Sequence, residues 1–185
     1  MKRFTIAVAA MLAIVMLVWA HAAQAQVREA AVTGGRVAGV EANGIVSFKG
    51  IPFAAPPIGA LRWKAPQPVH PWSGVKQTGS FGPGCVQAAS PYTQVPSMSE
   101  DCLYLNVWTP AKTANDRLPV MVWIYGGAFT GGAASMAMYD GTRLAEKGVV
   151  IVTLNYRLGV FGFMAHPELT KESPHHASGN YALLD

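Results

Sequence analysis

An apolar run that stops at two glycines constrains this 185-residue chain more than any other feature. The run extends from Val120 to Tyr125, and Gly126, Gly127 and Ala128 follow it directly. A run that is apolar on both faces predicts a strand inside a sheet that is covered on both sides. Glycines at its tip let the backbone turn and leave peptide N–H groups uncovered by side chains. N–H groups fixed in this way can stabilise the negative oxygen that forms when an ester carbonyl is attacked.

Residues 1–25 predict a secretory signal peptide. The chain starts with the positive Met1-Lys2-Arg3, continues with apolar residues from Ile6 to Val18, and reaches a small-x-small cleavage pattern at Ala23-Gln24-Ala25. A membrane anchor is the alternative, but the run is short for the roughly 20 residues that span a bilayer. We therefore expect residues 26–185 to form the fold of a secreted or periplasmic protein, with no stable membrane span after cleavage.

The charge pattern gives no sign of a nucleic-acid partner. The formal net charge of +4 falls to +2 without Lys2 and Arg3, which leaves twelve basic against ten acidic residues. The basic residues are scattered along the chain instead of forming a run. A near-neutral exported body is the simpler interpretation, and the oligomeric state stays open.

Cys85 and Cys102 are the two cysteines of the chain, and both follow the predicted signal peptide. Export to an oxidising compartment favours a disulfide between them. The alternatives are two free thiols or a metal site, and nothing near the cysteines adds further ligands at zinc-like spacing. The adjacent pair His175-His176 is a weak metal candidate, because neighbouring histidines rarely face one ion well. We expect neither a metal nor another cofactor.

The first half of the mature chain predicts short strands and ordered coil. Residues 26–50 fit antiparallel strands joined by tight turns, with Asn43-Gly44 as the best hairpin signal. The proline-rich stretch from Ile51 to Trp72 predicts an ordered coil over a surface, pinned by Phe53, Trp63 and Trp72.

The second half alternates strand and helix patterns. Strands are predicted at residues 103–108, 120–125 and 149–154, and a short helix at 142–147 ends before Gly148. Strand, helix and strand in that order predict a parallel βαβ unit. Residues 180–185 resemble the opening of another helix.

Four ordered blocks of motifs span most of the chain from about residue 30 onward. They are Gly50-Ile51-Pro52-Phe53-Ala54 with Pro56-Pro57 and Arg62-Trp63; Glu100-Asp101-Cys102-Leu103-Tyr104-Leu105-Asn106-Val107; Val122-Trp123-Ile124-Tyr125-Gly126-Gly127-Ala128-Phe129; and Asn155-Tyr156-Arg157-Leu158-Gly159 through Gly162-Phe163, with Gly179-Asn180-Tyr181 after it. Together these blocks resemble the type-B carboxylesterase family, which includes the cholinesterases, and so the chain resembles the N-terminal part of such a protein.

The resemblance implies an α/β fold, the N-terminal part of an α/β-hydrolase: a small antiparallel hairpin region followed by the first strands of a mostly parallel central sheet. It also implies oxyanion-hole donors at Gly127 and Ala128, with Gly126 giving the turn its freedom. Many family members have glycine where Ala128 stands, and the methyl group trims the space for bulky substrates. A buried ion pair between Arg62 and Glu100 is a further implication.

The implied reaction is hydrolysis of small-molecule carboxylic esters through an acyl-serine intermediate. No serine in the chain has a glycine two residues before it, so the chain contains no Gly-x-Ser-x-Gly nucleophile motif. The expectation is an active esterase in the full-length protein and an inactive isolated chain. The alternatives are a non-catalytic, cholinesterase-like binding or adhesion protein and a small binding module that is complete as given.

Overall fold

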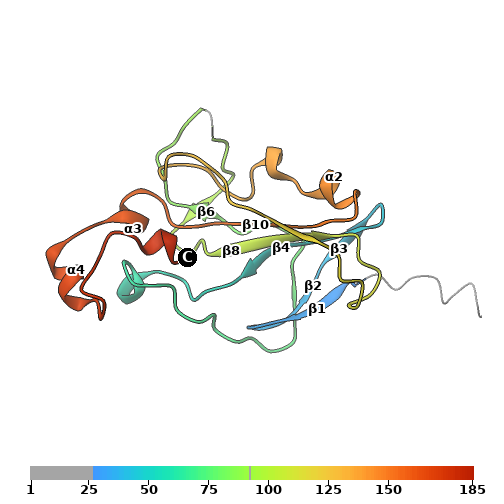
Figure 1. The fold of residues 1–185 in the computed structure, drawn as a ribbon, viewed down its shortest axis with the longest axis horizontal. Coiled ribbons are helices and arrows are strands. Elements are labelled where there is room, and N and C mark those ends of the chain that lie inside the picture. Colours follow the sequence, from blue (N-terminus) through green and yellow to red (C-terminus); the bar gives the residue numbers. More distant parts are fainter. Residues whose placement is uncertain (1–26, 92) are drawn as a thin grey trace, which may run out of the picture.

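The computed structural model describes residues 27–91 and 93–185 (Figure 1). The predicted signal peptide at residues 1–25 lies outside the described residues, and so does its cleavage site. Within the described ranges, no helix has both the length and the apolar character that a membrane span requires.

The strands form one larger and two smaller sheets. Their bounds are β1 Glu29–Val32, β2 Gly35–Ala38, β3 Val40–Ala42, β4 Ile45–Pro52, β5 Val75–Gln77, β6 Gly84–Cys85, β7 Met98–Ser99, β8 Tyr104–Thr109, β9 Val120–Trp123 and β10 Val150–Leu154. The larger sheet has the order β3-β4-β8-β10-β9, with β9 and β10 parallel and the other neighbours antiparallel. The smaller sheets have the orders β1-β2-β5 and β6-β7.

Helices are short and cover only parts of the sheet. The α-helices are α2 Thr142–Ala145, α3 Gly159–Phe163 and α4 Pro167–Glu172, and the 3-10 turns are η1 Gly59–Leu61, η2 Ala137–Tyr139 and η3 Tyr181–Leu183. In Figure 1, α2 lies on one face of the larger sheet and β1 and β2 lie on the other, while α3, α4 and the C-terminus gather at one end. Residues 180–185, predicted to open a helix, form the single turn η3.

Two predicted local structures are confirmed. Ala42 pairs with Ile45, so Asn43 and Gly44 form a two-residue hairpin loop with φ angles of 52° and 80°. Both angles are positive, as the favoured hairpin turn requires, and Asn-Gly meets that requirement best. The parallel βαβ unit is also present, with α2 between β9 and β10, and Gly148 ends its turn with a φ of 88°.

The predicted interior position of residues 120–125 is wrong for the residues that the structure describes. β9 lies at the edge of the larger sheet, and only β10 pairs with it there. Val120, Trp123 and Ile124 are 61%, 45% and 65% exposed, so the described residues do not bury this strand. The physical reason is that apolar side chains indicate that other residues cover a strand, but not which residues do so. Among the described residues, only β10 pairs with β9.

Buried apolar residues form three clusters around the larger sheet. One cluster packs the β1-β2-β5 sheet against β4, through Val37, Val46, Phe48 and Ile51. Another packs α2 against the opposite face, through Trp108, Ala145 and Ile151 with Ile45 beside them. The third lies at the end of the sheet where α3 and η3 gather. Its members are Ala54, Cys85, Cys102, Leu103, Tyr125, Ala134, Tyr156, Leu158 and Ala182.

The predicted disulfide between Cys85 and Cys102 is present in this third cluster. The two Cα atoms are 5.0 Å apart, and the side chains are 2% and 1% exposed. The bond closes a loop with a sequence separation of 17 residues, and this loop carries β6 and β7. It therefore fixes a segment that has little regular structure of its own.

We expect the double variant Cys85→Ala/Cys102→Ala to lose about 3 kcal/mol of unfolding free energy, because the open loop gains entropy in the unfolded chain. Urea unfolding under oxidising conditions measures the loss. Wild-type protein treated with dithiothreitol should show a similar loss, and the double variant should not respond to the reductant. Coincident unfolding curves for variant and wild type would contradict this role for the disulfide.

Candidate functional site

The segment after β9 is a turn with an unusual backbone. Tyr125 is buried, and the next four residues, Gly126–Phe129, are exposed. Gly127, Ala128 and Phe129 have φ angles of 144°, 52° and 64°. Such angles are rare for residues that carry a side chain, and three in succession are conspicuous. Strained backbone of this kind persists where the surrounding contacts determine it.

Hydrogen bonds inside the turn explain this conformation. The carbonyl oxygen of Gly127 accepts bonds from the N–H groups of Thr130 at 3.0 Å and Gly131 at 3.3 Å. The hydroxyl of Thr130 donates to the same oxygen at 3.1 Å. A Cβ atom at position 127 would lie 1.9 Å from the carbonyl oxygen of Gly131, so only glycine fits there. The sequence Gly-Gly-Ala is therefore matched to a turn that closes on itself.

The direction of one carbonyl sets the direction of the next N–H group. The described peptide bonds are all trans, so the N–H of Ala128 points opposite to the carbonyl of Gly127. That carbonyl points into the turn, and so the Ala128 N–H points out of it. Within residues 27–91 and 93–185, neither the Gly127 nor the Ala128 N–H donates a hydrogen bond. Both residues line a cavity of about 400 Å³.

Aromatic rings form the wall of this cavity. Tyr125 stacks on Tyr156 with ring centroids 4.6 Å apart, and the Tyr156 hydroxyl donates to the Tyr125 carbonyl at 2.8 Å. Burial raises the pKa of both phenols, so they stay neutral hydrogen-bond donors at neutral pH. The ring of Phe129 packs at a tilt of 49° against that of Phe163, and the Phe129 carbonyl accepts from the Gly159 N–H at 2.7 Å. These contacts fix both sides of the turn.

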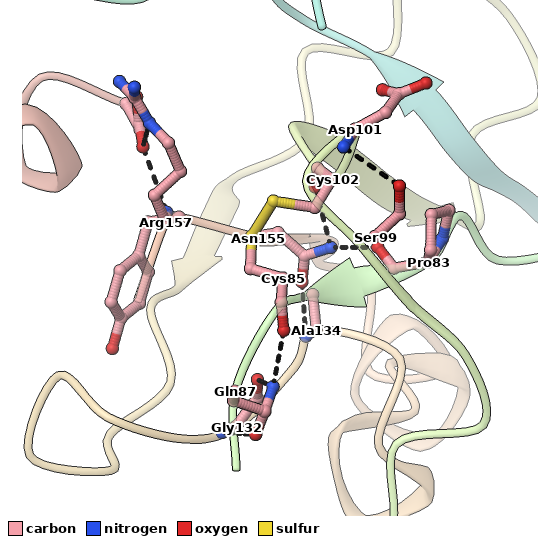
Figure 2. The surroundings of a disulfide bond; sticks show 12 residues. Pro83, Cys85, Gln87, Ser99, Asp101, Cys102, Gly132, Ala134, Asn155 and Arg157 are labelled. Atoms are coloured by element: carbon pink, nitrogen blue, oxygen red, sulfur yellow. Dashed lines mark hydrogen bonds and ion pairs between the residues drawn. A yellow bond between two sulfur atoms is a disulfide. The ribbon is translucent and has the colours of Figure 1, made fainter. Parts of the chain in front are cut away.

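Asn155 joins the chain that leaves the turn to the disulfide segment, as Figure 2 shows. Its side-chain oxygen accepts from the Ala134 N–H at 2.9 Å. Its amide nitrogen donates to the carbonyls of Pro83 and Cys102, each at 3.0 Å. Asn155 is 2% exposed, and its bonds to the buried residues Ala134 and Cys102 replace contacts with water that these backbone groups have lost. One amide therefore holds three chain segments together.

The structure brings Arg62 and Glu100 together, but not in a buried site. Their two hydrogen bonds measure 2.5 and 2.6 Å, and the side chains are 36% and 24% exposed. The expected burial is wrong because Arg62 belongs to the proline-rich coil on the surface and reaches Glu100 from outside. Such a pair contributes less than a buried one.

The buried ion pair joins Arg157 to Asp185, and sequence reasoning missed it. The side chains are 3% and 0% exposed, and Asp185 also accepts a bond from the Arg157 backbone N–H at 3.0 Å. The pair connects the end of β10 to the turn η3. Arg157 inside the otherwise uncharged segment Leu154–Leu158 was the one available signal, since a separation of 28 residues leaves no local pattern.

No histidine between residues 27 and 185 lines the cavity beside the turn. His166 accepts a hydrogen bond from the Glu168 N–H at the start of α4, and His70, His175 and His176 are exposed. Within the described part of the chain, no three or more His, Cys, Asp or Glu side chains are grouped so that they could hold a metal ion.

Comparisons with known proteins agree on one family. A family model described as the carboxylesterase family matches residues 22–185. The fumonisin B1 esterase of Sphingopyxis macrogoltabida is 51% identical over 153 residues, which cover 82% of this chain and 28% of that protein. The para-nitrobenzyl esterase of Bacillus subtilis (strain 168) is 48% identical over 156 residues, covering 82% of this chain and 31% of that protein.

Solved structures give the same answer. A PNB esterase structure matches with a TM-score of 0.76 and 45% identity, covering 85% of this chain and 32% of that chain. A carboxylesterase of Geobacillus stearothermophilus matches with a TM-score of 0.75 and 40% identity over the same shares. The chain thus spans 28–32% of the length of the relatives named here.

We expect Asn155→Ala to lower the free energy of unfolding by about 3 kcal/mol, because it leaves the buried N–H of Ala134 and the half-buried carbonyl of Pro83 without a partner and removes one of two bonds to the Cys102 carbonyl. Urea unfolding measures the effect. Asn115→Ala is the matched control, since Asn115 is exposed, and its effect should be small. Equal losses for the two variants would show that the Asn155 bonds do not hold the segments together.

Proposed function

Because this chain belongs to the carboxylesterase family, we propose that the protein containing it hydrolyses small-molecule carboxylic esters through an acyl-serine intermediate. Its fold is the N-terminal portion of an α/β-hydrolase. The relatives include a fumonisin B1 esterase and a para-nitrobenzyl esterase, both of which carry ester cleavage in their names. The proposal includes export, since residues 1–25 have the pattern of a signal peptide.

The observation that carries the proposal is the pair of unbonded N–H groups at Gly127 and Ala128. In ester hydrolysis, the attacked carbonyl oxygen becomes negative in the tetrahedral intermediate. Donors that are already oriented stabilise this charge without reorganising, and one such donor contributes about 3 kcal/mol. The turn offers two donors beside a cavity of about 400 Å³, and buried aromatic rings keep the turn in place.

The other catalytic groups would come from residues beyond these 185. The chain contains no Gly-x-Ser-x-Gly motif, so we propose that it supplies the oxyanion turn and not the nucleophile. The serine, its histidine base and an acidic partner would complete the site. On this proposal the isolated chain cannot form an acyl-enzyme.

The longer protein should hydrolyse p-nitrophenyl butyrate, and a serine-directed phosphonate should abolish the activity. Purified residues 26–185 should give no turnover above buffer. Absence of turnover by the longer protein would favour the non-catalytic binding or adhesion protein. Phosphonate-sensitive turnover by residues 26–185 alone would contradict the proposed division of the site.

Gly127→Ala should lower kcat of the longer protein about 100-fold, because the new Cβ would lie 1.9 Å from the Gly131 carbonyl oxygen and displace the turn. Gly74→Ala is the matched control, since Gly74 also has a positive φ, 72°, but a Cβ there meets nothing within 4 Å. Initial rates with p-nitrophenyl butyrate, together with melting temperatures, separate the two cases. Equal rates for both variants would argue against a catalytic role for the turn.

A further inference from the structure

Gln87 connects the disulfide loop to the chain that leaves the glycine turn. We propose that Gln87 is a positioning residue, which holds the turn so that the Gly127 and Ala128 N–H groups face the cavity. This inference rests on the proposed function and adds a residue to it. Gln87 is half-buried and lies two residues after Cys85.

The Gln87 side chain binds both backbone groups of Gly132. Its oxygen accepts from the Gly132 N–H at 2.8 Å, and its nitrogen donates to the Gly132 carbonyl at 2.8 Å. The second amide hydrogen donates to the carbonyl of Cys85 at 3.0 Å. A primary amide has two donors and an acceptor oxygen, and all three functions are used here. Figure 2 shows this side chain between Cys85 and Gly132.

The backbone at Gly132 has a conformation and close contacts that only glycine allows. Its φ is 119°, and a Cβ there would lie 2.5 Å from the ring of Tyr125. The same Cβ would lie 3.1 Å from the carbonyl oxygen of Gly126, so this oxygen sits close against Gly132. Gly131, the residue before, donates its N–H to the carbonyl of Gly127. The segment Gly131–Gly132 thus faces the carbonyls of the first two turn residues.

These two carbonyls determine where the candidate donors point. Across a trans peptide, the N–H of Gly127 is opposite to the carbonyl of Gly126, and the N–H of Ala128 is opposite to that of Gly127. Both carbonyls face the segment Gly131–Gly132, so both N–H groups face away from it. A rotation of either peptide plane would remove a donor from the cavity side. Gln87 fixes the segment against which both planes are set.

The anchor of Gln87 is itself rigid. The disulfide fixes the chain at Cys85, and Asn155 binds the carbonyls of Pro83 and Cys102 at the two ends of the same loop. Asn155 also binds the N–H of Ala134, two residues after Gly132. The disulfide loop and the chain after Gly132 are therefore both held by Asn155. In this arrangement, the hydrogen bonds of Gln87 hold the turn in a fixed position relative to the disulfide loop.

Gln87→Met in the longer protein tests the inference, because methionine keeps the length of the side chain and removes its three hydrogen bonds. Gln94→Met is the matched control, since Gln94 lies in the same loop and is exposed. We expect Gln87→Met to lower kcat for p-nitrophenyl butyrate about tenfold or more, with KM changed less than about twofold. A trifluoromethyl ketone, which forms a tetrahedral oxyanion on the serine, should bind more weakly by the same factor as kcat falls. The control should change neither quantity.

Hydrogen–deuterium exchange of the segment Gly126–Gly132 gives a readout that does not need activity. Gln87→Met should exchange faster there than wild type, and Gln94→Met should not. Gln87→Glu is the second variant if the first does not fold, because it keeps an acceptor for the Gly132 N–H and loses both donors. The same exchange increase is expected for it.

The outcomes separate the two proposals. Exchange in Gly126–Gly132 that is unchanged in the Gln87 variants overturns the inference, as does a kcat equal to that of Gln94→Met. A higher KM with an unchanged kcat also overturns the inference, because that pattern is a loss of substrate binding alone. If the wild-type longer protein does not cleave the ester, the proposed function fails, and the exchange measurement still decides whether Gln87 holds the turn.

Discussion

The side-chain amide of Asn155 is the interaction on which the rest of this structure depends. It lies at the end of β10, where the sheet meets the disulfide loop and the glycine turn. Without it, the buried N–H of Ala134 and the carbonyl of Pro83 would have no hydrogen-bond partner among the described residues, and the carbonyl of Cys102 would keep only its bond from the Tyr104 N–H. Its three bonds reach different segments. They therefore fix the chain that leaves the glycine turn relative to the end of β10. A strained backbone needs such a frame, since its own preferences oppose it.

In the glycine turn, steric constraints on the backbone set the direction of two N–H groups. A carbonyl that accepts bonds inside the turn forces the neighbouring N–H groups outward, since each peptide unit is planar and trans. Gly127 is needed because a Cβ would meet the Gly131 carbonyl, and Ala128 tolerates its φ of 52° only because hydrogen bonds and rings hold both sides. The two N–H groups are therefore oriented by the protein alone, as the proposed oxyanion role requires. That preorganisation is what separates an oxyanion site from an ordinary loop.

The sequence was most predictive where a feature has a local chemical cause. Asn43-Gly44 predicts its own hairpin turn, Gly148 its helix end and the four motif blocks the α/β-hydrolase fold class, which is confirmed. Contacts without a local pattern were not predictable. The Arg157–Asp185 pair spans 28 residues, and Gln87 binds the backbone of Gly132, which has no side chain to mark it. The apolar run of β9 predicts that other residues bury this strand, but it does not identify the segment that does so. The oxyanion role of Gly127 and Ala128 remains a prediction.

The most direct test of the central claim is a crystal structure of the longer protein after reaction with a serine-directed phosphonate. The phosphoryl oxygen then stands where the oxyanion of the tetrahedral intermediate would be. Our account predicts that this oxygen lies about 2.7–3.1 Å from the backbone nitrogens of both Gly127 and Ala128. An oxygen that points elsewhere, or these two N–H groups bonded to other protein atoms, would contradict the account.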